Sequence, residues 1–132
     1  MCGDVMKFDP ADLKPIYLQI AEGIEDDILN GLLEEGKECY SQYEISRMFN
    51  INPATAAKGI NLLVQEGILY KVRGLGMHVS KGAKAMIRAK RRPAIAESVR
   101  QLVLEAEKLG ISKDELIRMI QETTIPEKED PT

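Results

Sequence analysis

The chain has 132 residues, 44% of them hydrophobic and 30% charged, which suffices for one ordinary domain with an appendage. No apolar stretch is long enough to span a bilayer, and the first ten residues lack the segments of a secretion signal. We therefore expect a cytoplasmic protein without a membrane partner. Two cysteines, Cys2 and Cys39, and the single His78 provide neither a disulfide framework nor metal-ligand spacing, so we expect no metal and no cofactor.

The net charge of −3 is unevenly distributed along the chain. Residues 1–50 carry 4 basic and 11 acidic side chains, residues 51–92 carry 9 and 1, and residues 93–132 carry 5 and 9. A basic block between acidic blocks is typical of a surface that binds a polyanion, although a solvated surface with uneven charge would give the same pattern.

The first predicted element is an amphipathic helix from Pro15 to about Asn30, because isoleucines recur every fourth residue over 16–28. Gly31 ends this helix. A turn over residues 32–37 then leads into a short extended piece at residues 38–40.

Two short helices joined by a tight turn come next. Ser41, three residues before Glu44, has the spacing of a capping box, and Asn50 suits the left-handed end of a helix. Asn52, followed by a proline, begins the next helix, which runs to Gly67. This pattern predicts a helix-turn-helix, whose second helix enters the major groove of DNA.

The start and the polar face of that second helix supply the first candidate DNA contacts. They are Asn52, Ala54, Thr55, Lys58 and Asn61. Short hydrogen-bonding groups at a helix N-terminus suit phosphate, and Lys58 adds a positive charge one turn later. Asn52 can equally serve as a cap alone, and Lys58 as a solvated lysine.

After Gly67 the period changes from helical to extended. Residues 68–73 are rich in strand formers, residues 74–76 form a glycine turn, and residues 77–80 return, which predicts a β-hairpin. As a wing, this hairpin would lie along the DNA backbone or minor groove, where glycine lets main-chain N–H groups approach phosphate. The candidate contacts are Lys71, Arg73, Gly74 and Gly76. We expect His78 to pack structurally, whereas the basic residues of 81–92 either extend the phosphate contacts or form a solvated helix face.

Residues 81–122 are predicted to form a helical tail. Pro93 should kink or interrupt it because proline lacks a backbone donor, and Gly110 separates a last helix that reaches Glu122. The tail has apolar stripes with little local core, which a second copy would cover in a homodimer. The candidate dimerisation residues are Ile95, Val99, Leu102, Val103, Ala106, Leu116, Ile117 and Ile120. The alternative is that the tail folds back on its own domain.

The predicted fold is therefore mainly α with a small β-hairpin: a winged helix-turn-helix domain at 11–80, a dimerisation tail at 81–122, and a disordered acidic end at 123–132. We do not expect an enzyme, because no base–nucleophile pair surrounds the single histidine. The rival function is a winged-helix module that binds protein through its wing, and the basic block at 51–92 favours DNA over it. A small-molecule effector that binds beside the tail stays open.

Residues 15–79 resemble the N-terminal domain of the GntR family of bacterial transcription regulators. The matching segments are PIYLQIAEGIEDDILNGLLEEG, SQYEIS, INPATAAKGINLLVQEGIL and YKVRGLGMHV. The Asn-Pro-x-Thr start of the recognition helix and the basic Lys58 are similar to the YtrA-like subgroup, whose short two-helix tail fits residues 82–122. The resemblance implies a homodimeric regulator, often a repressor, that binds a two-fold symmetric operator in double-stranded DNA.

Two departures from the family pattern concern base readout. Many members have Pro-Ser-x-Arg where this chain has Tyr40 to Tyr43, and that arginine commonly touches DNA. The resemblance thus adds Ser41 and Tyr43 to the candidates, with the tyrosine either making no such contact or replacing it by its hydroxyl. An arginine often found at the position of Ala57 is also absent, which leaves Thr55, Lys58 and the wing as the stronger candidates.

Overall fold

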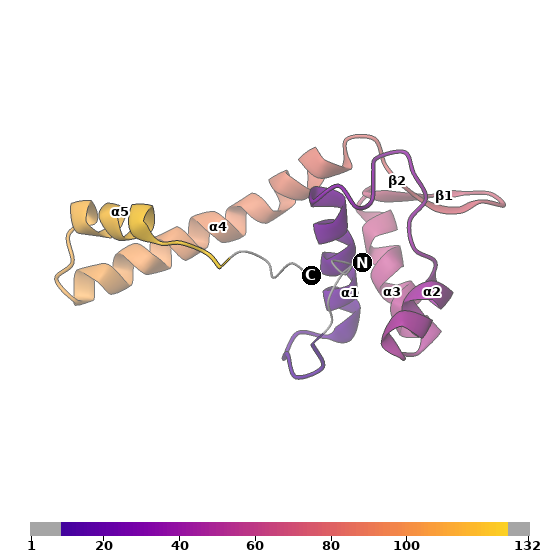
Figure 1. Ribbon diagram of the computed structural model, residues 1–132, viewed down its shortest axis with the longest axis horizontal. Helices are drawn as coiled ribbons and strands as arrows, with labels where there is room; N and C mark the ends of the chain where they lie inside the picture. The colour runs from indigo at the N-terminus through magenta and orange to yellow at the C-terminus, as the bar shows by residue number, and fades with distance from the viewer. Residues whose placement is uncertain (1–8, 127–132) are drawn as a thin grey trace. The chain divides into compact units, whose positions relative to one another are not determined.

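A computed structural model describes residues 9–126, which form five helices and one two-stranded antiparallel sheet (Figure 1). The elements in chain order are α1 (Ile16–Leu29), α2 (Gln42–Phe49), α3 (Pro53–Gln65), β1 (Leu69–Val72), β2 (Gly76–Val79), α4 (Ala83–Lys108) and α5 (Lys113–Glu122). The predicted fold class is confirmed. The chain divides into two compact units, one up to Arg88 and one from Ala89, and each is described by itself. Most of the acidic end predicted to be disordered, from residue 127 onward, lies outside the described residues.

The core of the first unit lies where α1 packs on α3. Three isoleucines of α1 are fully buried there, at positions 20, 24 and 28. From α3 the core receives Ala56, Ile60 and Leu63. The first turns of α4 add Ala83 and Ile87. Burial of a side chain as large as isoleucine contributes about 1.5–3 kcal/mol, so this cluster is the main stabilising feature of the unit.

Local capping signals determine where α2 and α3 begin. Ser41 Oγ accepts from the Glu44 N–H at 3.1 Å, and Glu44 Oε1 accepts from the Ser41 N–H at 2.9 Å, which completes the predicted capping box. Asn50 adopts the left-handed conformation with φ of 53°. Asn52 caps α3 by accepting from the Ala54 N–H at 2.8 Å. The helix-turn-helix is thus built as its local sequence predicts.

The hairpin projects away from α1, α2 and α3 (Figure 1). Strands β1 and β2 pair antiparallel, with Leu69 opposite Val79; Gly74 in the turn and Gly76 at the start of β2 have φ of 80° and 86°. Glycine adopts such positive φ without the steric cost of a side chain. The extended piece before α2 joins the other edge of β2, where the Cys39 N–H donates to the Met77 carbonyl oxygen at 2.8 Å.

Two carboxylates of the first unit accept hydrogen bonds from residues that are distant in the sequence. Asp27 binds Tyr40, just before α2, and Glu35 binds the start of α4. Tyr40 Oη donates to Asp27 Oδ2 at 2.6 Å, and burial together with this bond raises the pKa of the Tyr40 hydroxyl. Glu35 accepts from the N–H groups of Gly82 and Lys84, at 2.9 and 3.0 Å, at the start of α4. These two bonds lower the pKa of Glu35, because a charged acceptor is favoured at a helix N-terminus.

In the second unit, α4 continues through Pro93, so of the kink or interruption predicted there the interruption is wrong, and the kink stays a prediction. Pro93 and Ala89, whose carbonyl loses its helical donor, are both exposed, so solvent can reach the unpaired oxygen. Ser112 then caps α5 by accepting from the Glu115 N–H at 3.1 Å. No helix among residues 9–126 is long and apolar enough to cross a bilayer.

Glycine at position 59 allows α1 to approach α3 closely. A Cβ atom there would lie 2.7 Å from the backbone oxygen of Tyr17 and 3.0 Å from Ile20 Cγ2. The backbone oxygen belongs to a helix and cannot rotate away. Any larger residue at position 59 therefore has to push the two helices apart.

We predict that Gly59→Ala destabilises the chain by about 1–3 kcal/mol through this overlap, although alanine is the better helix former by about 1 kcal/mol. Urea titration at one protein concentration gives the free energy of unfolding. Gln65→Ala, on the exposed face of the same helix, is the control and should change stability by less than about 0.5 kcal/mol. A Gly59→Ala protein as stable as the wild type would contradict the prediction.

Candidate nucleic-acid interface

The exposed face of α3 forms one wall of an open hollow of about 620 Å³. The first turn of α1 and the start of α2 border this hollow. Its lining residues are Tyr17, Gln42, Ala54, Ala57, Lys58, Asn61, Leu62 and Gln65. Small side chains at 54 and 57 leave room between the polar ones, so an external group can approach the α3 backbone closely.

The structure brings three of the predicted recognition-helix residues together in this hollow: Ala54, Lys58 and Asn61. Asn52 and Thr55 lie at the N-terminal end of α3 instead, where Asn52 is exposed and Thr55 is half-buried. The side-chain oxygen of Asn52 already accepts the capping bond from Ala54. What remains of Asn52 for an external partner is its amide NH₂ group.

At the start of α2, the hollow is lined by Gln42, which is not among the contacts predicted from the sequence. Ser41 uses its side chain for the capping box, and Tyr43 is 61% exposed beside it. Gln42, between them, is the one that lines the hollow. Neighbouring residues of a helix point in directions about 100° apart. The local sequence signals located the start of α2 but did not indicate which of its first residues faces the hollow.

Four further lining residues are absent from the candidate contacts, two of them apolar, Ala57 and Leu62, and two of them polar, Tyr17 and Gln65. Gln65 lies four residues after Asn61 on the same helix face, so helical periodicity was a signal that could have found it. Tyr17 comes from α1, far earlier in the chain, and no local pattern links it to α3. Its ring lies under Lys58, with Nζ 4.1 Å from the ring centroid, within the range of a cation–π contact.

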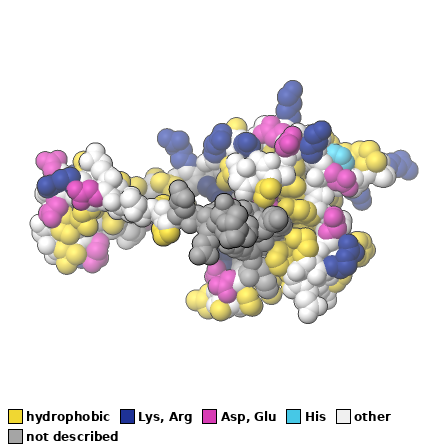
Figure 2. All heavy atoms as spheres, viewed as in Figure 1, with side chains coloured by type: hydrophobic (Ala, Val, Ile, Leu, Met, Phe, Trp, Pro, Cys, Tyr) yellow, Lys and Arg dark blue, Asp and Glu magenta, His cyan; other side chains and the backbone are white. Residues whose placement is uncertain are grey.

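The wing residues Lys71 and Arg73 are both exposed on the hairpin, whose basic side chains are visible in Figure 2. Nothing lies within 4 Å of a Cβ built on Gly74, so the positive φ is what favours glycine there. Leu75 at the tip is 63% exposed. The tip thus places exposed backbone next to the basic side chains of Lys71 and Arg73, while the Leu75 N–H donates to the Val72 carbonyl oxygen at 2.9 Å.

His78 is half-buried in β2 and packs against a neighbouring ring, as its position predicted. Its ring centroid lies 5.9 Å from that of Tyr70, and its Nδ1 atom is buried with no hydrogen-bond partner among the described residues. Within residues 9–126, no group of three or more His, Cys, Asp and Glu side chains is placed to hold a metal ion.

In the second unit, the predicted dimerisation residues differ in their exposure. Ala106 and Leu116 are 6% and 7% exposed, so both belong to this unit's own small core. Val103 is half-buried. The remaining predicted residues are large, apolar and at least 44% exposed: Ile95, Val99, Leu102, Ile117 and Ile120. Contiguous exposed side chains of this kind mark interaction surfaces.

No protein-family model matches the chain. It is 30% identical over 118 residues to the HTH-type transcriptional repressor YtrA of Bacillus subtilis, covering 89% of this chain and 91% of YtrA. A GntR family transcriptional regulator from Listeria monocytogenes superposes with a TM-score of 0.71 at 29% identity, over 89% of this chain and 100% of the other. BusR of S. agalactiae, solved in complex with its busAB-promotor DNA, superposes at 0.50 and 25% identity, over 86% of this chain and 60% of BusR. The match to YtrA is long enough to include residues of both units.

Proposed function

This chain belongs to the GntR family of transcriptional regulators, in its YtrA-like subgroup, and on that premise we propose that it is a cytoplasmic repressor that binds a two-fold symmetric operator as a homodimer. The family consists of regulators, in agreement with the expectation that the chain is not an enzyme. The observation that carries the proposal is the hollow along the exposed face of α3, with an exposed basic wing on the same unit.

The chemistry of the hollow supports DNA as the ligand. Its polar side chains are three amides, one lysine and one tyrosine, and none of its lining residues is acidic. Lys58 supplies the charge that phosphate requires. Asn and Gln side chains pair with the N6 and N7 edge of adenine in the major groove, whereas guanine is read mainly by arginine or lysine. We therefore expect adenines in the half-site opposite Gln42, Asn61 and Gln65.

The apolar surface of the second unit supports a homodimer. Ile95, Val99 and Leu102 recur at helical spacing on one face of α4, and all three are exposed. An isologous interface presents the same patch twice, so a self-complementary apolar stripe suits it. A dimer would also present two recognition helices to two half-sites about one helical turn apart.

Selection of bound sequences from a random duplex pool tests the proposed function. With competitor nucleic acid at physiological salt, we expect an inverted repeat with half-sites spaced by about one helical turn and with adenines in each half. An unpaired single half-site would contradict the dimer. Recovery of no enriched sequence would contradict sequence-specific binding and favour the protein-binding module.

On the selected operator, Lys58→Ala and Arg73→Ala should each weaken binding and flatten its dependence on salt. Removing one lysine or arginine from a phosphate lowers the slope of log K against log salt by about 0.9, and a dimer loses two such side chains. The measurement is the dissociation constant at several salt concentrations. Lys113→Ala, which also removes one exposed lysine, is the matched control and should leave both quantities unchanged. Unaltered slopes in both interface variants would refute these contacts.

Val99→Lys combined with Leu102→Lys should weaken the dimer by about a hundredfold or more, since the large apolar side chains of both protomers would lose burial worth about 1.5 kcal/mol each. Lysine is a good helix former, so α4 should persist. Sedimentation equilibrium measures the dimer, and Gln101→Lys, one residue away and off the apolar stripe, is the control. Dimers of undiminished stability in the double variant would exclude this face as the interface.

A further inference from the structure

The recognition lysine is held by an aromatic ring from a different helix. Lys58 Nζ lies 4.1 Å from the centroid of the Tyr17 ring, and both residues line the hollow. Lys58 is exposed and Tyr17 is half-buried. An ammonium group over the face of a tyrosine is attracted by about 0.5–1 kcal/mol at exposed sites.

The position of the Tyr17 ring follows from the packing of α1 on α3. Gly59 lets the Tyr17 backbone oxygen come so close that a Cβ there would be 2.7 Å away. Lys58 immediately precedes this glycine, so it lies where α1 and α3 come close together. The packing of α1 on α3 thus brings the two residues within reach of each other.

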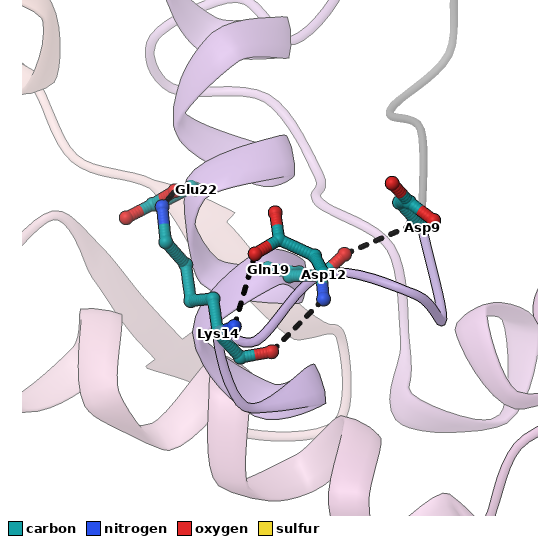
Figure 3. Close-up of polar contacts among 5 residues, drawn as sticks. All are labelled: Asp9, Asp12, Lys14, Gln19 and Glu22. Atoms are coloured by element: carbon teal, nitrogen blue, oxygen red, sulfur yellow. Dashed lines mark hydrogen bonds and ion pairs between the residues drawn. The ribbon is translucent and has the colours of Figure 1, made fainter.

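The first turn of α1 is itself anchored by polar contacts, which are part-buried at Gln19 and exposed at Lys14. Gln19 is 9% exposed, accepts from the Asp9 N–H at 2.9 Å and donates to the Lys14 carbonyl oxygen at 3.0 Å (Figure 3). Lys14 Nζ also bonds Glu22 Oε1 at 2.7 Å. These contacts tie the segment before α1 to the helix, so Tyr17 is presented from a well-fixed turn.

We propose that Tyr17 is a positioning residue of the DNA interface, which holds the Lys58 ammonium at the rim of the hollow before the operator arrives. A free lysine side chain loses about 2 kcal/mol of rotamer entropy when it is immobilised, and a side chain already held in place loses less on binding. The ring occupies one side of the ammonium, which leaves N–H donors for phosphate oxygens. This inference rests on the proposed function and adds a residue from outside the helix-turn-helix.

The test is a double-mutant cycle on the selected operator with Tyr17→Leu, Lys58→Ala and the combination of the two. Tyr17→Leu should weaken binding by about threefold per half-site, with a salt slope equal to the wild type because every phosphate contact remains. In the Lys58→Ala background, Tyr17→Leu should cost nothing further. Tyr17→Phe keeps the ring and should bind within about twofold of the wild type.

Three results would overturn the inference. The first is that Tyr17→Leu binds as tightly as the wild type or more tightly. The second is that Tyr17→Leu costs as much affinity in the Lys58→Ala background as in the wild type. The third is that Tyr17→Phe binds as weakly as Tyr17→Leu, which would assign the effect to the hydroxyl. Thermal unfolding of each variant monitors the fold, and Tyr17→Met replaces the leucine variant if that protein is unstable. Wild-type protein that binds no duplex overturns the proposed function and this inference together. If the wild type binds the operator and Tyr17→Leu binds it with the same affinity, only this inference is overturned.

Discussion

The approach of α1 to α3 at Gly59 is the contact on which the first unit depends. No side chain separates the two backbones there, so the isoleucines of α1 reach across to Ala56, Ile60 and Leu63 in a single core. Because interiors are close-packed and transmit strain, a shift of α1 would move α3 as well. The same contact sets the exposed face of α3, the hollow beside it and the ring under Lys58.

Long-range polar contacts hold the parts of the unit that lack a large apolar surface. Glu35 accepts from two N–H groups at the start of α4, where a helix leaves its first donors unpaired. With Ala83 and Ile87 in the core, the first turns of α4 belong to the DNA-binding unit. Later turns of the same uninterrupted helix carry the exposed apolar residues. One helix therefore contributes to both units.

The positions of the acidic residues explain how a chain of negative net charge can have a basic surface at the hollow. Asp27 and Glu25 are each 1% exposed, and Asp27 accepts from the Tyr40 hydroxyl. Glu35 is engaged at the start of α4. None of the residues lining the hollow is acidic. A chain with a net charge of −3 thus presents a locally basic and polar surface, because the field near a surface depends on its own charges more than on the total.

Elements whose signals are local could be predicted from the amino-acid sequence alone, whereas contacts across the fold required the tertiary structure. Ser41 with Glu44, Asn50 and Asn52 mark helix ends through contacts within a few residues, and the recurrence of isoleucine identifies the buried face of α1. The recognition helix, the wing and most of their candidate contacts follow from such signals. Tyr17 under Lys58 and the Glu35 cap on α4 join positions far apart in the chain, and no periodicity encodes such pairs. Short-range hydrogen bonds specify elements, but burial and contact depend on the packing of all elements at once.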